Sequence, residues 1–313
     1  PIERADELPT RDDFLLELGL ILDTDVMRSA PKAQTELFSP TMPEEDRQLR
    51  LDEPVVNLRD VVAKFPRLQL VEELAARYRF LHWELEFADL FRDRGGFDLM
   101  VGNPPWLPVT WKEADVLGDA DPSFVLKKLS AKATADRRED ALERLGLRGR
   151  YLGAHEAAAG TASFLGAETN YPLLRGVKTN LYKCFLPQCW DWTNERGTVG
   201  LLHPEKVYDE PSGGALRAAL YPRLRRHYQF SNEMELFPEV HHQLKFSVNV
   251  FGPPRAQVRF DHIANLFAVA TIEASLEQTG VGDVPGLKDD DNNWAVAGHR
   301  DRIIEVDSEA LAL

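Results

Sequence analysis

The sequence predicts an α/β protein, because short apolar strand segments alternate with segments of helical spacing. Three segments, residues 97–101, 197–204 and 244–251, have the length and apolar content of strands. Residues 181–186 carry an apolar stripe at helical spacing between the first two of them. With 313 residues the chain is long enough to bury a sizeable core, as one domain or as a domain with an appendage.

Composition indicates an ordinary soluble protein, with 43% hydrophobic and 28% charged residues. No apolar run has the length of a membrane span and no signal peptide opens the chain, so we expect a cytoplasmic protein without a membrane partner. The two cysteines, Cys184 and Cys189, fit a reducing compartment and form no zinc pattern. Neither the pair His241 and His242 nor the acidic run 289–291 has ligand spacing, so we assign no metal.

Net charge restricts how this chain could hold a nucleic acid. It carries 51 acidic against 37 basic residues, a balance of −14, whereas binding to a phosphate backbone depends on Lys and Arg. Two local groups of basic residues are either solvated helix faces or phosphate contacts: Arg217, Arg223, Arg225, Arg226 and His227, and Lys127, Lys128, Lys132, Arg137 and Arg138. The overall balance places the main grip on any DNA elsewhere.

The most informative stretch is residues 95–106, GGFDLMVGNPPW, an apolar strand that stops at an Asn-Pro-Pro-Trp turn. Pro104 and Pro105 each lack an N–H and fix their own φ, so neither a strand nor a helix continues through them. The amide oxygen of Asn103 and the carbonyl of Pro104 are two acceptors that could converge on an exocyclic amine. Trp106 offers a face on which a planar base can stack.

This turn resembles the catalytic motif of the amino-methyltransferases, in which Asn, Asp or Ser precedes Pro-Pro and an aromatic residue. The preceding residues 79–91, RFLHWELEFADLF, extend the match. Together they resemble the adenine-specific N6 DNA methyltransferases of the large restriction-modification and phage-defence type, the type IIG-like enzymes. From the residues alone, the HWELEF segment could be a strand or the edge of a helix.

The resemblance implies a partial Rossmann-like sheet of the class I methyltransferases, with flanking helices and a helical insertion. It also implies transfer of a methyl group from S-adenosylmethionine to N6 of an adenine flipped out of double-stranded DNA. Asn103, Pro104, Pro105 and Trp106 would then be the catalytic residues. Enzymes that methylate RNA bases or protein glutamine amides share the turn, and an inert scaffold or partner-binding piece is a further alternative.

The main departure from the family is a missing glycine-rich cofactor turn ahead of residues 103–106. Such a turn lets the backbone approach the ligand at the end of a parallel strand. The nearest imitation, residues 160–166, comes after the motif, and we expect it to be a loop. We therefore expect the main cofactor site, the N-terminal strands and the target-recognition region to lie elsewhere in the same polypeptide or in a partner subunit.

Two later segments also resemble the family. Residues 176–186 resemble a helix that reaches the cofactor and base pocket, which makes Asn180 a candidate cofactor residue; helix capping by Thr179 or Asn180 is the alternative. Residues 235–246 resemble a loop whose aromatic or basic groups flank the flipped base, which makes Phe237 and Lys245 candidate substrate residues. Phe237 and Phe246 could instead be core residues.

We expect five parts: a helical and connector segment 1–75, the motif strand 76–120, a helical insertion 121–175, the rest of the methyltransferase domain 176–260 and an extension 261–313. The further expected elements are helices at 11–27 and 55–80 with a break near Pro66, a connector at 30–45, a helix pair within 122–151 ended by Gly146, Gly149 and Gly153, a loop at 206–216, and helices at 215–224 and 264–276.

Overall fold

The computed structural model describes residues 12, 19, 65–144 and 146–312. The chain divides into two compact units, Pro1–His82 and Trp83–Leu313. In the first unit the structure describes helix α5, Pro66–Tyr78, with proline in its first turn and Arg79 at its end in the left-handed region, at φ 52°. The expected break near Pro66 is thus the start of a helix. The predicted helix at 11–27 and connector at 30–45 lie almost wholly outside the described residues.

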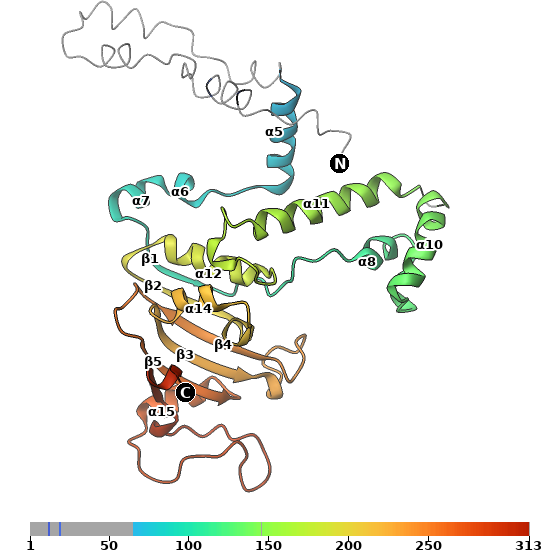
Figure 1. Cartoon of the computed structure of the whole chain (residues 1–313). Coiled ribbons are helices and arrows are strands. Elements are labelled where there is room, and N and C mark those ends of the chain that lie inside the picture. Colours follow the sequence, from blue (N-terminus) through green and yellow to red (C-terminus); the bar gives the residue numbers. More distant parts are fainter. Residues whose placement is uncertain (1–11, 13–18, 20–64, 145, 313) are drawn as a thin grey trace, which may run out of the picture. The chain divides into compact units, whose positions relative to one another are not determined.

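The second unit contains a six-stranded mixed sheet in the order β1-β2-β4-β3-β5-β6, which confirms the α/β prediction (Figure 1). Strands β1, β2, β3 and β5 run in one direction, and β4 and β6 run in the other. The carboxyl ends of β1, β2 and β3 and the amino end of β4 therefore lie at the same end of the sheet. The strands are β1 Phe97–Gly102, β2 Thr193–Pro204, β3 Leu224–Ser231, β4 Lys245–Phe251, β5 Arg259–Leu266 and β6 Ile304–Asp307.

Helices α12, Leu181–Asp191, and α14, Gly214–Leu220, lie on the same side of this sheet (Figure 1). Their apolar side chains, including the fully buried Leu186 and Leu220, pack with Val199 and Leu201 of β2. Each such buried side chain contributes about 1.5–3 kcal/mol relative to an exposed one. We call this side the helix-covered face.

The opposite face has its own core, which we call the aromatic face. Phe230 of β3 and Phe246 of β4 stack there with ring centroids 5.4 Å apart, against Ile263 of β5. Helix α15, Ala270–Glu277, contributes Ile272 to this core. Strand alternation separates the two faces, since neighbouring residues of a strand point to opposite sides.

The segment before β1 is helical, which resolves the open choice for HWELEF. Helices α6, Trp83–Glu86, and α7, Ala88–Arg94, precede the strand. The rings of Trp83, Phe87 and Phe91 each lie 5.3–5.7 Å from that of Phe97. This aromatic cluster packs the two short helices against the start of β1.

Residues 113–166 form a group of helices with a small core of their own, in which Leu117, Phe124 and Leu142 are buried. The helices are α8 Glu113–Gly118, α9 Ser123–Leu126, α10 Ala131–Arg144 and α11 Arg148–Gly166. Two expectations were wrong here. Gly149 and Gly153 do not end a helix, and residues 160–166 are not a loop, because all of them lie within the alanine-rich helix α11. Of the three glycines, Gly146, at φ 63°, is the one that lies between α10 and α11.

Other boundaries also differ from the predictions. The loop expected at 206–216 contains helix α13, Lys206–Asp209, and the following helix ends at Leu220. Residues 264–266 finish strand β5, so the helix expected from 264 begins only at Ala270. The remaining described elements are the short 3-10 helices Pro172–Leu174, Asn232–Met234, Arg300–Arg302 and Ala310–Ala312.

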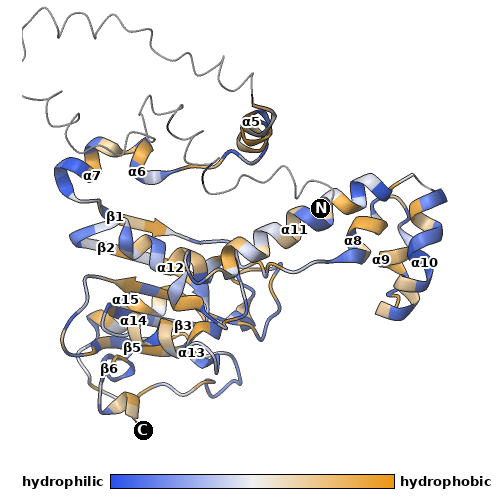
Figure 2. Ribbon diagram, turned by 45° about the horizontal axis from the view of Figure 1, so that its top comes forward, coloured by the Kyte–Doolittle hydropathy of each residue, from blue (hydrophilic) through white to orange (hydrophobic). Residues whose placement is uncertain are grey.

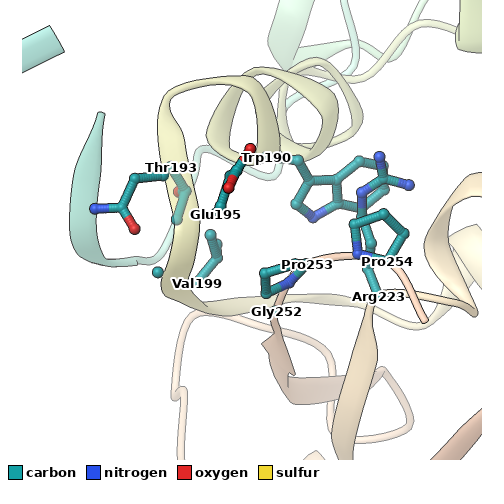
Figure 3. Close-up of a pocket in the computed structure, with 10 residues that line it drawn as sticks. Trp190, Thr193, Glu195, Val199, Arg223, Gly252, Pro253 and Pro254 are labelled. Atoms are coloured by element: carbon teal, nitrogen blue, oxygen red, sulfur yellow. The ribbon is translucent and has the colours of Figure 1, made fainter. Parts of the chain in front are cut away.

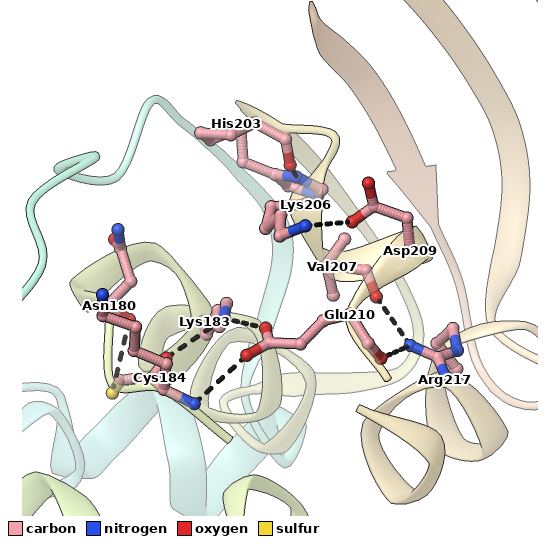
Figure 4. Close-up of polar contacts among 11 residues, drawn as sticks. Asn180, Lys183, Cys184, His203, Lys206, Val207, Asp209, Glu210 and Arg217 are labelled. Atoms are coloured by element: carbon pink, nitrogen blue, oxygen red, sulfur yellow. Dashed lines mark hydrogen bonds and ion pairs between the residues drawn. The ribbon is translucent and has the colours of Figure 1, made fainter. Parts of the chain in front are cut away.

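A buried ion pair ties α12 to the end of α13 (Figure 4). The ammonium group of Lys183 contacts a carboxylate oxygen of Glu210, and both side chains are at most 10% exposed. Lys183 also donates to the carbonyl of Lys178 at 3.1 Å, and Glu210 accepts from the Lys178 N–H at 3.2 Å. Arg217 donates to the backbone carbonyl of Glu210, which extends the contact to α14.

Lys183→Met should destabilise the protein by about 3–5 kcal/mol, because it leaves the Glu210 carboxylate buried without a cation. Lys183→Met combined with Glu210→Gln should recover most of that loss, since the glutamine oxygen can still accept from Lys178. Urea unfolding measures both variants. Arg259→Met is the matched control: it breaks an exposed pair with Glu305 and should cost at most about 1 kcal/mol. Equal losses for Lys183→Met and Arg259→Met would contradict this account.

Candidate active site

The Asn-Pro-Pro-Trp turn follows the carboxyl end of β1, at the same end of the sheet as the carboxyl ends of β2 and β3. Gly102 of β1 is in register with Leu201 of β2, so Asn103 leaves the sheet beside the end of β2. Asn103 is exposed, and its side-chain amide makes no hydrogen bond within the described part of the chain, whereas Pro104 is buried. The turn therefore anchors itself through one proline and presents the amide outward.

The indole of Trp106 is fixed from two sides. Its Nε1–H donates to the carbonyl of Leu202 at 3.3 Å, near the end of β2. The ring packs edge-on to Phe237 at 5.6 Å and tilted to Phe246 at 5.8 Å. Because Trp106 is only partly buried, its orientation is set while part of the ring stays open to a ligand.

The chain leaving the turn pairs with the start of α12. Leu181 N–H donates to the carbonyl of Leu107 at 3.0 Å, and Val109 N–H donates to that of Thr179 at 3.4 Å. Asn180 lies between these two bonds, at the N-cap position of α12, but its side chain makes no capping hydrogen bond. Its Oδ1 atom is buried without a partner among the described residues, so capping does not explain this side chain.

The two candidate substrate residues are placed differently. Phe237 is partly buried against Trp106 and Phe246, and Phe246 itself is a core residue that is 2% exposed. Lys245 is exposed and precedes Phe246 in β4, so strand alternation directs it to the helix-covered face, away from Trp106. The structure thus brings Phe237 to the motif and does not bring Lys245 there.

A cavity of about 400 Å³ runs beside β1. Among the described residues β1 pairs with β2 alone, so its outer edge carries no hydrogen-bonded neighbour. Leu99 and Val101 of this strand are 62% and 78% exposed, and Figure 2 shows most of β1 coloured as hydrophobic. The cavity is lined by Trp83, Phe97, Leu99, Met100, Val101, Gly102, Asn103, Pro104, Pro105, Phe185, Cys189 and Leu201.

A polar network that sequence reasoning missed lies on the helix-covered face. Asn249 is completely buried; its Nδ2 donates to Nε2 of His203 at 3.0 Å, and its Oδ1 accepts from the hydroxyl of Tyr208. Glu205 accepts from His227 and Gln229, both at 2.9 Å. One signal was available: if Phe246 and Val248 face an apolar core, Ser247 and Asn249 must face the other side.

Burial and hydrogen bonding shift the titration of this network. Burial opposes ionisation of Glu205, but the hydrogen bonds from His227, Ser247 and Gln229 prevail and lower its pKa to about 2. Burial lowers the pKa of His203 to about 4, so its ring is neutral near pH 7. The neutral ring places its proton on Nδ1, which lies 3.0 Å from the carbonyl of Pro204, and leaves Nε2 to accept from Asn249.

A second cavity, of about 350 Å³, lies at the opposite end of β2 (Figure 3). Trp190 and Arg223 form one wall, and the guanidinium group lies 5.1 Å from the indole ring centre. Pro253 and Pro254, which follow β4, form another. The cavity lies at the end of the strands away from residues 103–106, so it is separate from the candidate site.

The arginines of the first basic group are mostly used inside the fold. Arg217 donates to the carbonyl of Glu210, and Arg223 to that of Ala219. Arg225 donates to the carbonyls of Pro222, Arg223 and Leu224. In the second group, Arg138 pairs with Glu113. These contacts favour a structural role for Arg217, Arg223, Arg225 and Arg138.

The described residues contain no group of three or more His, Cys, Asp or Glu side chains able to hold a metal ion. None of their helices is long and apolar enough to cross a membrane.

No protein-family model and no curated protein matches this sequence. Among solved structures, a type I restriction-modification methyltransferase subunit from Streptococcus thermophilus matches with a TM-score of 0.28 and 16% identity, covering 63% of this chain and 35% of that one. A nuclease-deletion mutant of the type ISP restriction-modification enzyme LlaGI, in complex with a DNA substrate mimic, matches with a TM-score of 0.25 and 10% identity, covering 83% of this chain and 30% of that one. This chain thus spans about a third of the length of each, and likeness at such scores assigns neither fold nor function.

The free energy of unfolding should fall as the pH is lowered from about 6.5 to about 4. His203 has a folded pKa of about 4, below its ordinary value of 6.5, so in this range the unfolded state binds more protons. The contribution is present above pH 6.5 and amounts to about 2–3 kcal/mol that is lost by pH 4. Urea unfolding across this range should show a flatter profile for His203→Asn. The exposed His242→Asn is the control and should keep the wild-type slope; a wild-type slope in His203→Asn would contradict the assignment.

Proposed function

We propose that this chain is the base-binding part of an S-adenosylmethionine-dependent methyltransferase that modifies N6 of adenine in DNA, within a restriction-modification or phage-defence system. The observation that carries the proposal is the turn at the end of β1. It presents the amide of Asn103, which has no hydrogen-bond partner among the described residues, beside an indole whose orientation is set by Leu202, Phe237 and Phe246. These groups suit a planar base that carries an exocyclic amine.

The chemistry of the chain's own residues is positioning. The Asn103 amide oxygen and the Pro104 carbonyl accept from the two N–H bonds of the adenine amine, which directs the nitrogen lone pair away from the turn. Trp106 stacks on the base, a contact worth about 1–3 kcal/mol. The target must leave the duplex to reach them, since its amine is inaccessible inside the base stack. No strong base is needed before transfer, because the amine proton would leave to water only after the nitrogen has gained the methyl group and with it a positive charge.

We further propose that this chain supplies one side of a cofactor site. When bound, S-adenosylmethionine would supply an electrophilic methyl group beside the turn. The unpartnered, buried Oδ1 of Asn180 is an acceptor close to the residues that leave the turn, and a ligand donor would satisfy it. Asn180 is therefore the residue of this chain that we propose to contact the cofactor.

We infer that the main cofactor site comes from strands outside this part of the sheet. Parallel strands are usually covered on both faces and paired on both edges. In the described residues β1 has one neighbour, exposes Leu99 and Val101, and borders an apolar cavity. A further strand and its helix, from the same polypeptide or a partner subunit, would cover these groups and bring the glycine-rich turn that the sequence lacks. The DNA target-recognition region would also lie outside this chain.

Asn103→Ala in the assembled enzyme should lower methyl transfer to adenine about a hundredfold or more, because the amine loses an aligned acceptor. Transfer from radiolabelled S-adenosylmethionine measures it. Asn103→Asp is the informative comparison, since the carboxylate keeps an acceptor at the same position and should retain part of the activity. Cofactor affinity should be unchanged in both variants. Full turnover by Asn103→Ala would rule out the proposed role.

Calorimetric titration of this chain alone with S-adenosylmethionine should show no binding, because the glycine-rich turn is missing. Adding the polypeptide that completes the sheet beside β1 should restore binding, and Asn180→Ala should weaken it about tenfold, as expected for one lost hydrogen bond. Micromolar binding by the isolated chain would instead show that its own residues form the whole cofactor site.

A further inference from the structure

The loop that connects β3 to β4 lies at the end of the sheet that carries the Asn-Pro-Pro-Trp turn. Its two ends are joined, since Asn232 N–H donates to the carbonyl of Leu244 at 3.2 Å. Glu235 adopts the left-handed conformation at φ 52°, a region that side chains other than glycine rarely adopt without support. The Glu235 N–H donates to the backbone carbonyl of Asn232 at 2.8 Å, which closes this turn, so the residues that follow Glu235 need a support of their own.

The side chain of Asn232 supplies that support. It is completely buried, and both its amide nitrogen and its amide oxygen form hydrogen bonds with the loop backbone. Its Nδ2 donates to the carbonyls of Phe237 at 2.9 Å and Val240 at 2.8 Å, while its Oδ1 accepts from the Phe237 N–H at 3.0 Å. Both backbone polar groups of Phe237 thus bond to one side chain, and the Phe237 carbonyl also accepts from the Val240 N–H at 3.0 Å.

Fixing this backbone fixes a ring that touches the candidate site. Phe237 lies edge-on to Trp106 at 5.6 Å and edge-on to Phe246 at 5.0 Å. Phe246 is held by its own strand, whereas Phe237 lies in a loop and has no strand to position it. The place of the Phe237 ring therefore depends on the two bonds from Asn232 to its backbone and on the third, which holds Val240 beside it.

We propose that Asn232 is a positioning residue for the base site: it holds Phe237 against Trp106 and so sets the aromatic wall on which the adenine is seated. This inference rests on the proposed function for its ligand, but the positioning itself can be measured without one. Among the described residues no hydrogen bond joins Asn232 to the Asn-Pro-Pro-Trp turn, so we expect it to act through Phe237.

The chemistry of asparagine explains why this side chain suits the role. It combines two N–H donors with one acceptor on a short stem, which is what two carbonyls and one N–H of the loop require. Asn232→Asp keeps an acceptor for Phe237 N–H but loses both donors and turns a negative charge toward two carbonyl oxygens. Asn232→Ser, a milder change, can keep one bond and cannot span both carbonyls.

The experiment uses the whole chain labelled with ¹⁵N-tryptophan, with the indole resonance of Trp106 assigned from its loss in Trp106→Phe. In the wild type we expect a magnetisation-transfer cross-peak between the Trp106 indole proton and the Phe237 ring. Titration with deoxyadenosine should shift the Trp106 resonance. In Asn232→Asp the cross-peak should disappear and the dissociation constant for deoxyadenosine should rise about tenfold. If the Asn232→Asp variant does not fold, the same two measurements are made on Asn232→Ser, for which we expect the same changes.

Asn249→Asp is the matched control, because Asn249 is an equally buried asparagine with two donors engaged, on the other face of the sheet. It should keep both the cross-peak and the affinity. Phe237→Ala should weaken deoxyadenosine binding, and Asn232→Asp should add nothing further in the double variant, as expected for a residue that acts through Phe237.

Three results would overturn the inference: an unchanged cross-peak in the Asn232 variants, an equal loss in Asn249→Asp, or additive losses in the double variant. Failure of the proposed function would look different. The wild type would then keep its cross-peak while deoxyadenosine left the Trp106 resonance unshifted.

Discussion

The candidate site depends on the parallel register between β1 and β2. Leu99 to Gly102 pair in sequence with Thr198 to Leu201, so the turn after Gly102 emerges beside Leu202. The carbonyl of Leu202 then accepts the indole N–H of Trp106. A shift of β1 by one residue would exchange its two faces and separate this donor from its acceptor. The aromatic contacts and the outward amide of Asn103 follow from that one register.

Strand β4 separates two kinds of chemistry across the sheet. Phe246 and Val248 face the aromatic core beside Trp106, whereas Ser247 and Asn249 face the polar network around His203. Each polar atom of Asn249 finds a partner there, so the network avoids the cost of unpaired buried groups. A shift in the register of β4 would place its polar side chains in the apolar core and its apolar side chains in the polar network, so the register is strongly specified. Strand β4 pairs with β2 on one side and β3 on the other, and so fixes the position of both.

The parts of the fold that sequence predicted best are those with a local cause. Alternation located β4, and the apolar run ending in Asn-Pro-Pro-Trp located β1, because strand periodicity and proline geometry act over a few residues. Helix α11 was missed because Gly149, Gly153 and Gly160 suggest loops, whereas alanines and tertiary context keep the segment helical. The partners of Trp106 were only partly predictable. Phe237 came from a resemblance, but nothing in the sequence shows that Asn232 folds back on the loop that follows it.

Under the proposed function, two observations indicate that other segments complete the site: the net charge of −14, and the edge of β1 that has no paired strand among the described residues. Several arginines that could have contacted phosphate are used to hold backbone carbonyls, as with Arg217 and Arg225, or to pair with carboxylates, as with Arg138. The remaining cations of these groups, such as Lys127 and Lys132, are outnumbered by the acidic residues of the chain, whereas binding to a DNA backbone depends on charge neutralisation. Under the proposed function, this chain positions the base while other segments supply the electrostatic grip and most of the cofactor site. The edge of β1 that has no paired strand among the described residues lies next to Asn103, so such a segment would have to join there for the two halves of the site to meet.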